Sequence, residues 1–156
     1  MPTTITHILY PTDFSAHSAA ALPPVTALAR LFHAEVLLLH IIEPPALPPE
    51  ALVLGETWQA LMDEARREAL AKLDGLARVL KDQGVAVTTR VVTGSVVPRI
   101  LEAAKEEHVE LIALGTHGRT GLSSVLLGSV ADKIVRLATC PVLTVRNPAM
   151  PPEEPR

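Results

Sequence analysis

Hydrophobic residues gather in five short runs along the chain, and polar residues are rare within them. The runs consist mainly of Val, Ile and Leu, without the strict polar and apolar alternation of a strand that has one solvated face. Such runs are typical of strands that are covered on both faces. The predicted strands are residues 8–10, 36–42, 85–92, 111–114 and Val142–Val145.

The stretches between these runs have apolar residues at spacings of three and four, which predicts amphipathic helices. The predicted helices are residues 18–32, 58–81, 97–107 and 125–138. In the second helix, one apolar stripe is expected to face the core: Leu61, Ala65, Ala69, Leu73, Leu76 and Leu80. Gly84 is expected to end it with a left-handed cap. Strands that alternate with helices indicate parallel βαβ units and therefore an α/β fold.

Prolines modify this picture in two places. Pro23 and Pro24 remove two backbone donors, so we expect a break or bend in the first helix. Residues 43–55 contain four prolines and no clear period, which predicts a surface loop. Whether this loop covers a site as a lid or only connects two elements stays open.

The composition indicates one folded domain. A chain of 156 residues with 48% hydrophobic residues can bury one substantial core, and we assign it to residues 1–146, followed by a flexible Pro- and Glu-rich tail over residues 147–156. A net charge of -3 without a block of Lys and Arg argues against binding to nucleic acid or to a membrane surface. No signal peptide and no membrane-spanning apolar run are recognisable, so we expect a soluble, cytoplasmic protein. The single Cys140 is interpreted as a buried thiol.

A glycine-rich segment follows the fourth predicted strand. Gly115, Gly118 and Gly121 lie in it, and Gly128 and Ser129 open the last helix. A helix N-terminus at the carboxyl end of a strand offers N–H groups to phosphate, and glycines let the backbone approach the anion closely. The segment matches neither the Walker loop nor the dinucleotide fingerprint. On the residues alone, a phosphate-binding loop and an unliganded turn both remain open.

A second candidate segment joins the first strand to the first helix. Asp13 and Ser15 are both good N-cap residues, whose side chains accept an early helical N–H. The carboxyl end of the first strand is also the switch point of a doubly wound sheet, where an Asp can hold a ribose hydroxyl or a base amine. One solution is that Ser15 caps the helix while Asp13 binds.

At these two segments the chain resembles the universal stress protein family, over nearly its full length. The ATP-binding members of that family carry a glycine, two residues, a glycine, nine residues, and then glycine followed by Ser or Thr. The corresponding residues here are Gly115, Gly118, Gly128 and Ser129. Four further stretches are also family-like: ILYPTDFS at residues 8–15, LLHII at 38–42, GSVVP at 94–98 and CPVLTV at 140–145.

The resemblance implies an open, Rossmann-like, five-stranded parallel sheet in the order 3-2-1-4-5, of the adenine nucleotide alpha hydrolase-like type. It implies ATP, together with Mg²⁺, across the ends of strands 1 and 4, and a homodimer formed through Val142–Val145. The implied nucleotide-binding residues are Pro11, Thr12 and Asp13 at the adenosine, Ile41 at the adenine edge through its backbone, Gly115, Thr116, His117, Gly118 and Arg119 around the ribose and phosphates, and Gly128, Ser129 and Val130 at the phosphates.

These observations favour an ATP-binding stress-response regulator. Fast phosphoryl transfer requires charge neutralisation, a positioned nucleophile and usually carboxylates that hold Mg²⁺. The two segments offer Arg119 and Asp13 and no obvious general base, so we assign no catalytic residue and no metal ligand. The alternatives are a slow ATPase or nucleotidyl-transfer enzyme on the same fold, and a dimeric interaction module without nucleotide. We interpret His40 as a packing residue near a strand end, and Asp132 and Lys133 as charges on a helix face.

Overall fold

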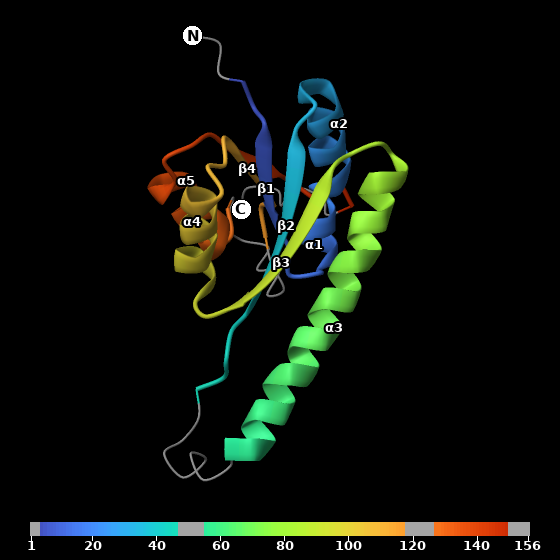
Figure 1. Ribbon diagram of the computed structural model, residues 1–156. Helices are drawn as coiled ribbons and strands as arrows, with labels where there is room; N and C mark the ends of the chain where they lie inside the picture. Colours follow the sequence, from blue (N-terminus) through green and yellow to red (C-terminus); the bar gives the residue numbers. More distant parts are fainter. Residues whose placement is uncertain (1–3, 47–54, 118–126, 150–156) are drawn as a thin grey trace.

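The fold is a five-stranded parallel sheet with helices on both faces (Figure 1). The computed structural model describes residues 4–46, 55–117 and 127–149. The strands are β1 His7–Pro11, β2 Glu35–Ile42, β3 Val87–Thr93, β4 Leu111–Gly115 and β5 Val142–Val145. The helices are α1 Ala16–Ala19, α2 Leu22–Phe32, α3 Gly55–Asp82, α4 Val96–Glu106 and α5 Ser129–Leu137. The strand order β3-β2-β1-β4-β5 confirms the predicted topology.

The core lies in two layers, one on each face of the sheet. Val36 and Leu38 of β2 pack with the buried residues of α2 and α3, whereas Leu37 and Leu39 point to the other face and pack with those of α4 and α5. Both faces of the strand are therefore buried, which explains why its sequence shows no polar alternation. Figure 1 shows α2 and α3 on one side of the sheet and α4 and α5 on the other.

The first predicted helix is two helices. α1 ends at Ala19 and α2 begins at Leu22, so the break that we expected is present. The break lies before the prolines, since Pro23 and Pro24 stand in the first turn of α2. Proline is tolerated there, because the first N–H groups of a helix have no hydrogen-bond acceptor within the helix.

The long helix α3 bears out the C-terminal half of the predicted stripe. Ala69, Leu73 and Leu80 are buried, together with Ala77, which the prediction left out, whereas Ala65 and Leu76 are only partly buried. Gly84 follows the helix in the left-handed conformation with φ 79°. Leu61 corrects the prediction, since it is 54% exposed. Figure 1 shows the reason: the N-terminal part of the 28-residue helix extends past the sheet, where no core is available to cover it.

Two predicted element boundaries also need correction. The strand expected at residues 85–92 is Val87–Thr93, although Val85 is buried just before it. The last helix was expected from residue 125, which lies outside the described residues, but Leu127 and Gly128 are not helical and α5 begins at Ser129. The glycine that was predicted to open the helix is its N-cap.

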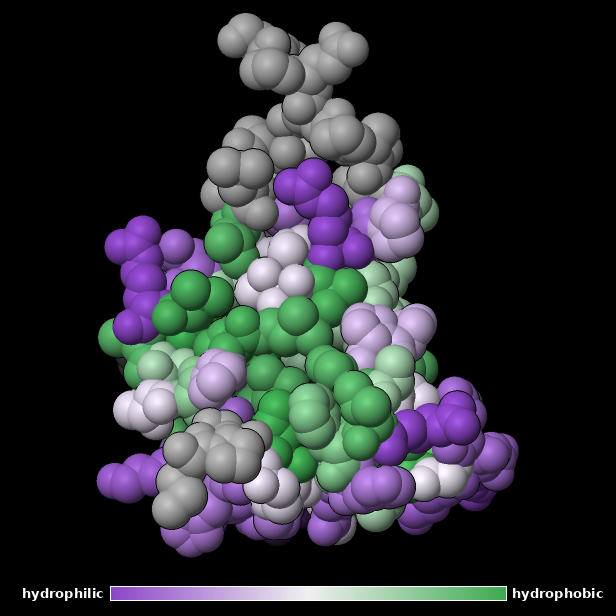
Figure 2. All heavy atoms as spheres, turned by 90° about the horizontal axis from the view of Figure 1, so that it is seen from above, coloured by the Kyte–Doolittle hydropathy of each residue, from purple (hydrophilic) through white to green (hydrophobic). Residues whose placement is uncertain are grey.

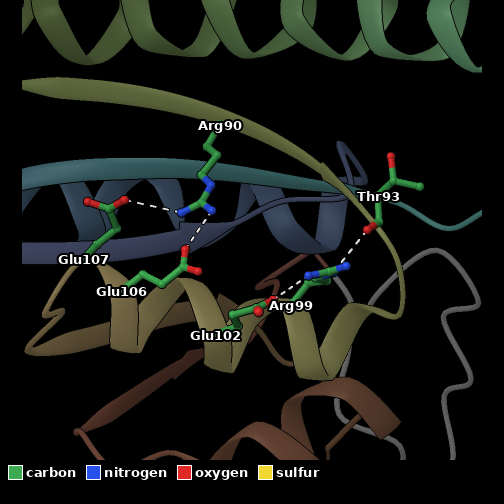
Figure 3. A network of polar contacts seen from close by, with 6 residues as sticks. All are labelled: Arg90, Thr93, Arg99, Glu102, Glu106 and Glu107. Atoms are coloured by element: carbon green, nitrogen blue, oxygen red, sulfur yellow. Dashed lines mark hydrogen bonds and ion pairs between the residues drawn. The ribbon is translucent and has the colours of Figure 1, made fainter.

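Two arginines tie the edge strand β3 to α4 (Figure 3). Arg90 of β3 lies 2.7 Å from Glu106 and 3.3 Å from Glu107 at the end of α4. At the start of the helix, Arg99 donates to the Thr93 carbonyl at 3.1 Å and lies 2.6 Å from Glu102. Exposed pairs contribute at most about 1 kcal/mol each. Their geometry nevertheless fixes both ends of α4 along the edge of the sheet.

Replacement of Gly94 by alanine should destabilise this region. Gly94 has φ 144°, and an added Cβ would lie 2.6 Å from Arg99 Nε. Because L residues rarely adopt this φ and the arginine would have to leave its place, we expect a loss of about 2 kcal/mol in the free energy of unfolding. Urea denaturation measures it. Gly75→Ala is the matched control, since Gly75 lies in α3 with open space around it and should gain up to about 1 kcal/mol. Equal effects of the two substitutions would contradict the prediction.

The amino ends of the strands carry an apolar surface. Figure 2, seen from above relative to Figure 1, shows hydrophobic side chains gathered across the middle of this end. Five exposed large apolar residues belong to the C-terminal parts of α2, α3 and α5: Leu31, Phe32, Val79, Val135 and Leu137. The candidate nucleotide site lies at the opposite edge, where the strands end. Among the described residues, no helix combines the length and apolar character needed to cross a membrane.

Candidate functional site

The two segments singled out in the sequence meet at the carboxyl edge of the sheet. β1 pairs with both β2 and β4. After β1 the chain continues to β2 on one side, whereas after β4 it continues to β5 on the other side. This is the topological switch point, where open α/β sheets bind their ligands. The turn after β1 and the residues after β4 are neighbours there, as the 5.8 Å separation between the His17 and His117 rings shows.

The turn after β1 is held by its own side chains. Ser15 caps α1 by accepting the Ser18 N–H at 3.1 Å, and Asp13 Oδ1 accepts the Ser15 N–H at 2.9 Å. Thr12 Oγ1 accepts the Phe14 N–H at 3.0 Å and lies 2.8 Å from Ser18 Oγ. The expected division of roles is therefore half confirmed: Ser15 does cap the helix. Asp13 is half-buried and shapes the turn, which the sequence reasoning did not foresee.

Gly115 ends β4 directly against α1. An added Cβ would collide with the His17 carbonyl oxygen and lie 2.9 Å from its carbon. Thr116 continues the sheet, because its N–H donates to the Val145 carbonyl at 2.9 Å. The sequence reasoning assigned this glycine to the approach of an anion. The structure adds a packing reason, which is the close contact between two backbones.

The start of α5 lies beside the end of β4. Gly128 N–H donates to the Thr116 carbonyl at 2.6 Å, and a Cβ at Gly128 would lie 2.8 Å from that oxygen. Ser129 and Val130 follow in the first turn, and the N-cap residue, Gly128, has no side chain with which to cap the helix. The first N–H groups of a helix have no intrahelical acceptor, and the helix dipole makes this end positive. The arrangement suits an anion.

Ile41 lies on β2 beyond the last ladder bond to β1. Thr12 N–H donates to the Leu39 carbonyl, whereas Gly94 N–H donates to the Ile42 carbonyl on the β3 side. Because successive residues of a parallel strand bond to opposite neighbours, the backbone groups of Ile41 face the side of β1. They lie beyond the end of that strand.

The structure thus brings together most of the predicted site residues. Pro11, Thr12 and Asp13 lie at the end of β1, Ile41 on the neighbouring β2, Gly115, Thr116 and His117 at the end of β4, and Gly128, Ser129 and Val130 at the start of α5. Gly118 and Arg119 lie outside the described residues. Asp132, one turn into α5, pairs with Arg136 at 3.1 Å, as expected of a helix-face charge.

Sequence reasoning expected His40 to pack, which its contact with Phe14 confirms, but it missed the hydrogen bond of this residue. His40 is 7% exposed, and its Nδ1 lies 2.8 Å from the Thr12 carbonyl oxygen. Its ring centroid is 4.5 Å from that of Phe14, and Lys72 Nζ of α3 lies 5.4 Å from the Phe14 centroid. The only signal in the sequence is a polar residue inside an otherwise apolar strand.

Tyr10, the only tyrosine, lies under the site and gives a testable pH dependence. Its hydroxyl donates to the Ser18 carbonyl at 2.7 Å, and burial raises its pKa from 10.0 to about 12. A pKa raised by folding stabilises the folded state below the unfolded value, and this contribution is lost as the pH rises through the folded value. Phenolate absorbance should therefore appear only near pH 12, together with unfolding. A folded protein that titrates at the ordinary value would contradict this.

In the part of the chain that the structure describes, the titratable side chains form no metal centre. Among residues 4–46, 55–117 and 127–149, no group of three or more His, Cys, Asp or Glu residues could hold a metal ion. Cys140, which was expected to be a buried thiol, is only half-buried and lies at the amino end of β5, away from the site. Its burial raises the pKa of the thiol.

Comparison with known proteins places the chain in one family. The model of the universal stress protein family matches residues 4–146. Universal stress protein MJ0577 of Methanocaldococcus jannaschii is 34% identical over 152 residues, covering 90% of this chain and 94% of that protein. Universal stress protein YxiE of Bacillus subtilis is 34% identical over 139 residues, covering 86% and 94%.

Solved structures agree with this assignment. The structure of MJ0577 has a TM-score of 0.80 and covers 92% of this chain and 97% of its own. Two more distant structures share the fold: an Arabidopsis thaliana family protein with AMP bound, at 19% identity and a TM-score of 0.67, and a universal stress protein in complex with cAMP, at 21% and 0.69. They cover 92% and 93% of this chain, and 93% and 99% of their own. The chain therefore belongs to the universal stress protein family.

Proposed function

We propose that this protein is an ATP-binding stress-response regulator that holds the nucleotide, with Mg²⁺, across the carboxyl ends of β1 and β4. The observation that carries the proposal is the N-terminus of α5, with glycine as its N-cap, beside the end of β4. Phosphates bind favourably at such a helix end. The family's ATP-binding glycine spacing, from Gly115 to Ser129, ends on this helix.

The remaining contacts follow from the arrangement of the strand ends. The base would lie beyond β1, where the Ile41 backbone faces it, with Pro11, Thr12 and Asp13 beside the adenosine. Gly115, Thr116 and His117, together with Gly118 and Arg119 from outside the described residues, would surround the ribose and phosphates. Gly128, Ser129 and Val130 would present the helix end to the phosphates. The two distant relatives with AMP and cAMP support an adenine nucleotide as the ligand class.

Calorimetry with ATP, ADP and AMP, each with and without Mg²⁺, tests this proposal. We expect binding of one ATP per chain, weakening as phosphates are removed, because each phosphate adds charge near the helix end. Gly118→Val should abolish ATP binding and leave the thermal unfolding transition present. Retained binding in that variant would contradict the assignment of the loop. A turnover assay then separates regulator from enzyme, since sustained ATP consumption, of about one per second per site or faster, would favour an enzyme.

We further propose a homodimer formed through β5. Val142–Val145 is a half-buried, apolar edge strand, and such an edge is normally covered. The carbonyls of Pro141 and Val145 accept from β4, so the N–H of Thr144 points away from the sheet.

Thr144→Pro should therefore convert the dimer to a monomer, because it removes an outward donor and leaves the ladder with β4 intact. Light scattering after size exclusion measures the mass. Thr144→Val keeps the donor and should remain a dimer. A proline variant with an unchanged dimer mass would contradict pairing through this edge.

A further inference from the structure

His40 lies between the two strand ends proposed to hold the adenosine. It follows Leu39, which accepts the Thr12 N–H, and precedes Ile41 on β2. Its Nδ1 is 2.8 Å from the Thr12 carbonyl oxygen. A carbonyl oxygen can only accept a hydrogen bond, so Nδ1 carries the proton and donates. One buried imidazole therefore joins the end of β1 to β2 where the backbone ladder stops.

The turn that this contact holds needs support. Phe14 has φ 64°, a left-handed conformation that costs a residue with a side chain about 1 kcal/mol or more. The His40 ring packs against the Phe14 ring at 4.5 Å, and the Lys72 ammonium approaches that ring from α3. Backbone and side-chain contacts from β2 and α3 thus converge on the residues directly after β1.

We propose that His40 is a positioning residue for nucleotide binding. Its Nδ1–H holds the Thr12 carbonyl, and its ring holds Phe14, so that Thr12 and Asp13 are already in place before the nucleotide arrives. Without these contacts the nucleotide must order the turn itself, and this cost reduces affinity. The inference rests on the proposed function, because it concerns the same site.

Two substitutions separate the hydrogen bond from simple packing. His40→Leu keeps much of the apolar volume and leaves the Thr12 carbonyl without its donor. His40→Asn is smaller but carries an amide N–H that can stand where Nδ1 stands. Packing alone would favour leucine, whereas the hydrogen bond favours asparagine. Thr26→Val is the matched control, since Thr26 is 5% exposed and its hydroxyl donates within α2, to the Leu22 carbonyl.

Calorimetry with ATP and Mg²⁺ on the full chain supplies the first readout. We expect His40→Leu to weaken the Kd about tenfold, the effect of one lost hydrogen bond, and His40→Asn to stay within about threefold of the unaltered protein. Thr26→Val should change the melting temperature and leave the Kd unchanged. A leucine variant within about twofold of the unaltered Kd, or an asparagine variant as weak as leucine, would overturn the proposal.

Amide hydrogen exchange without nucleotide supplies the second readout. The Phe14 and Ser15 N–H groups are bonded to Thr12 Oγ1 and Asp13 Oδ1, so they report the turn itself. His40→Leu should speed their exchange about tenfold and leave that of Gly94 unchanged. Unchanged exchange at Phe14 and Ser15 would overturn the proposal. If the unaltered chain bound no ATP, the proposed function would fail, and the exchange rates would still decide whether His40 holds the turn.

Discussion

Gly115→Ala is expected to lower the free energy of unfolding by about 3 kcal/mol and to abolish nucleotide binding. The methyl group would collide with the His17 carbonyl oxygen, and Ser18 Cα is only 3.1 Å away. Both are backbone positions, so no side chain can turn aside, and α1 must move away from β4. Because Ser18 also contacts Thr12 and Tyr10, the movement would disturb the end of β1 as well.

Urea denaturation and calorimetry on the same samples measure the two effects. Gly75→Ala is again the control, because it adds the same methyl group in open space. It should leave ATP affinity unchanged. If Gly115→Ala lowered the free energy of unfolding by less than about 1 kcal/mol, α1 could move away from β4 at little cost, and the glycine would not be needed for packing.

Ser129→Glu is expected to separate binding from folding. Ser129 is exposed in the first turn of α5, where a carboxylate interacts favourably with the helix dipole, so stability should be unchanged or raised by about 0.5 kcal/mol. The same carboxylate would lie beside the phosphates, and repulsion between such neighbouring negative charges costs about 3 kcal/mol of binding free energy. We therefore expect the Kd for ATP to weaken about 100-fold with an undiminished melting temperature.

Two control variants test whether the added charge causes the weaker ATP binding of Ser129→Glu. Ser129→Ala removes the hydroxyl without adding charge and should weaken binding less than tenfold, about the effect of one hydrogen bond. Thr139→Glu adds the same charge beyond the opposite end of α5 and should leave the Kd unchanged. If all three variants bound ATP equally well, the phosphates would not lie at the N-terminus of α5.

The element pattern was predictable because this sheet is buried on both faces. Continuous apolar runs marked all five strands to within two residues, and the helices between them followed from spacing. Local patterns failed where tertiary context decides. The expected stripe included Leu61 because its spacing fits, but a pattern cannot show that α3 is longer than the sheet. Pro23 and Pro24 indicated a break in the helix. The break lies before these prolines, because proline is favoured in the first turn of a helix.

The site was predictable in its location more than in its contacts. Glycine spacing and the Asp13 segment indicated two strand ends, and the structure brings these ends together. The steric need for glycine at position 115 depends on α1 crossing β4, a contact that no local pattern encodes. The bond between His40 and Thr12 joins residues 28 positions apart on neighbouring strands, so it required the register of β1 and β2.

The central claim is that this chain holds ATP at the ends of β1 and β4. The most direct measurement is to denature the purified protein, identify any released nucleotide by mass spectrometry, and then titrate the emptied, refolded protein with ATP and Mg²⁺ by calorimetry. We predict that ATP is released, or that the emptied protein binds it at sub-millimolar concentration with one site per chain. No released nucleotide and no heat of binding at that concentration would contradict the claim.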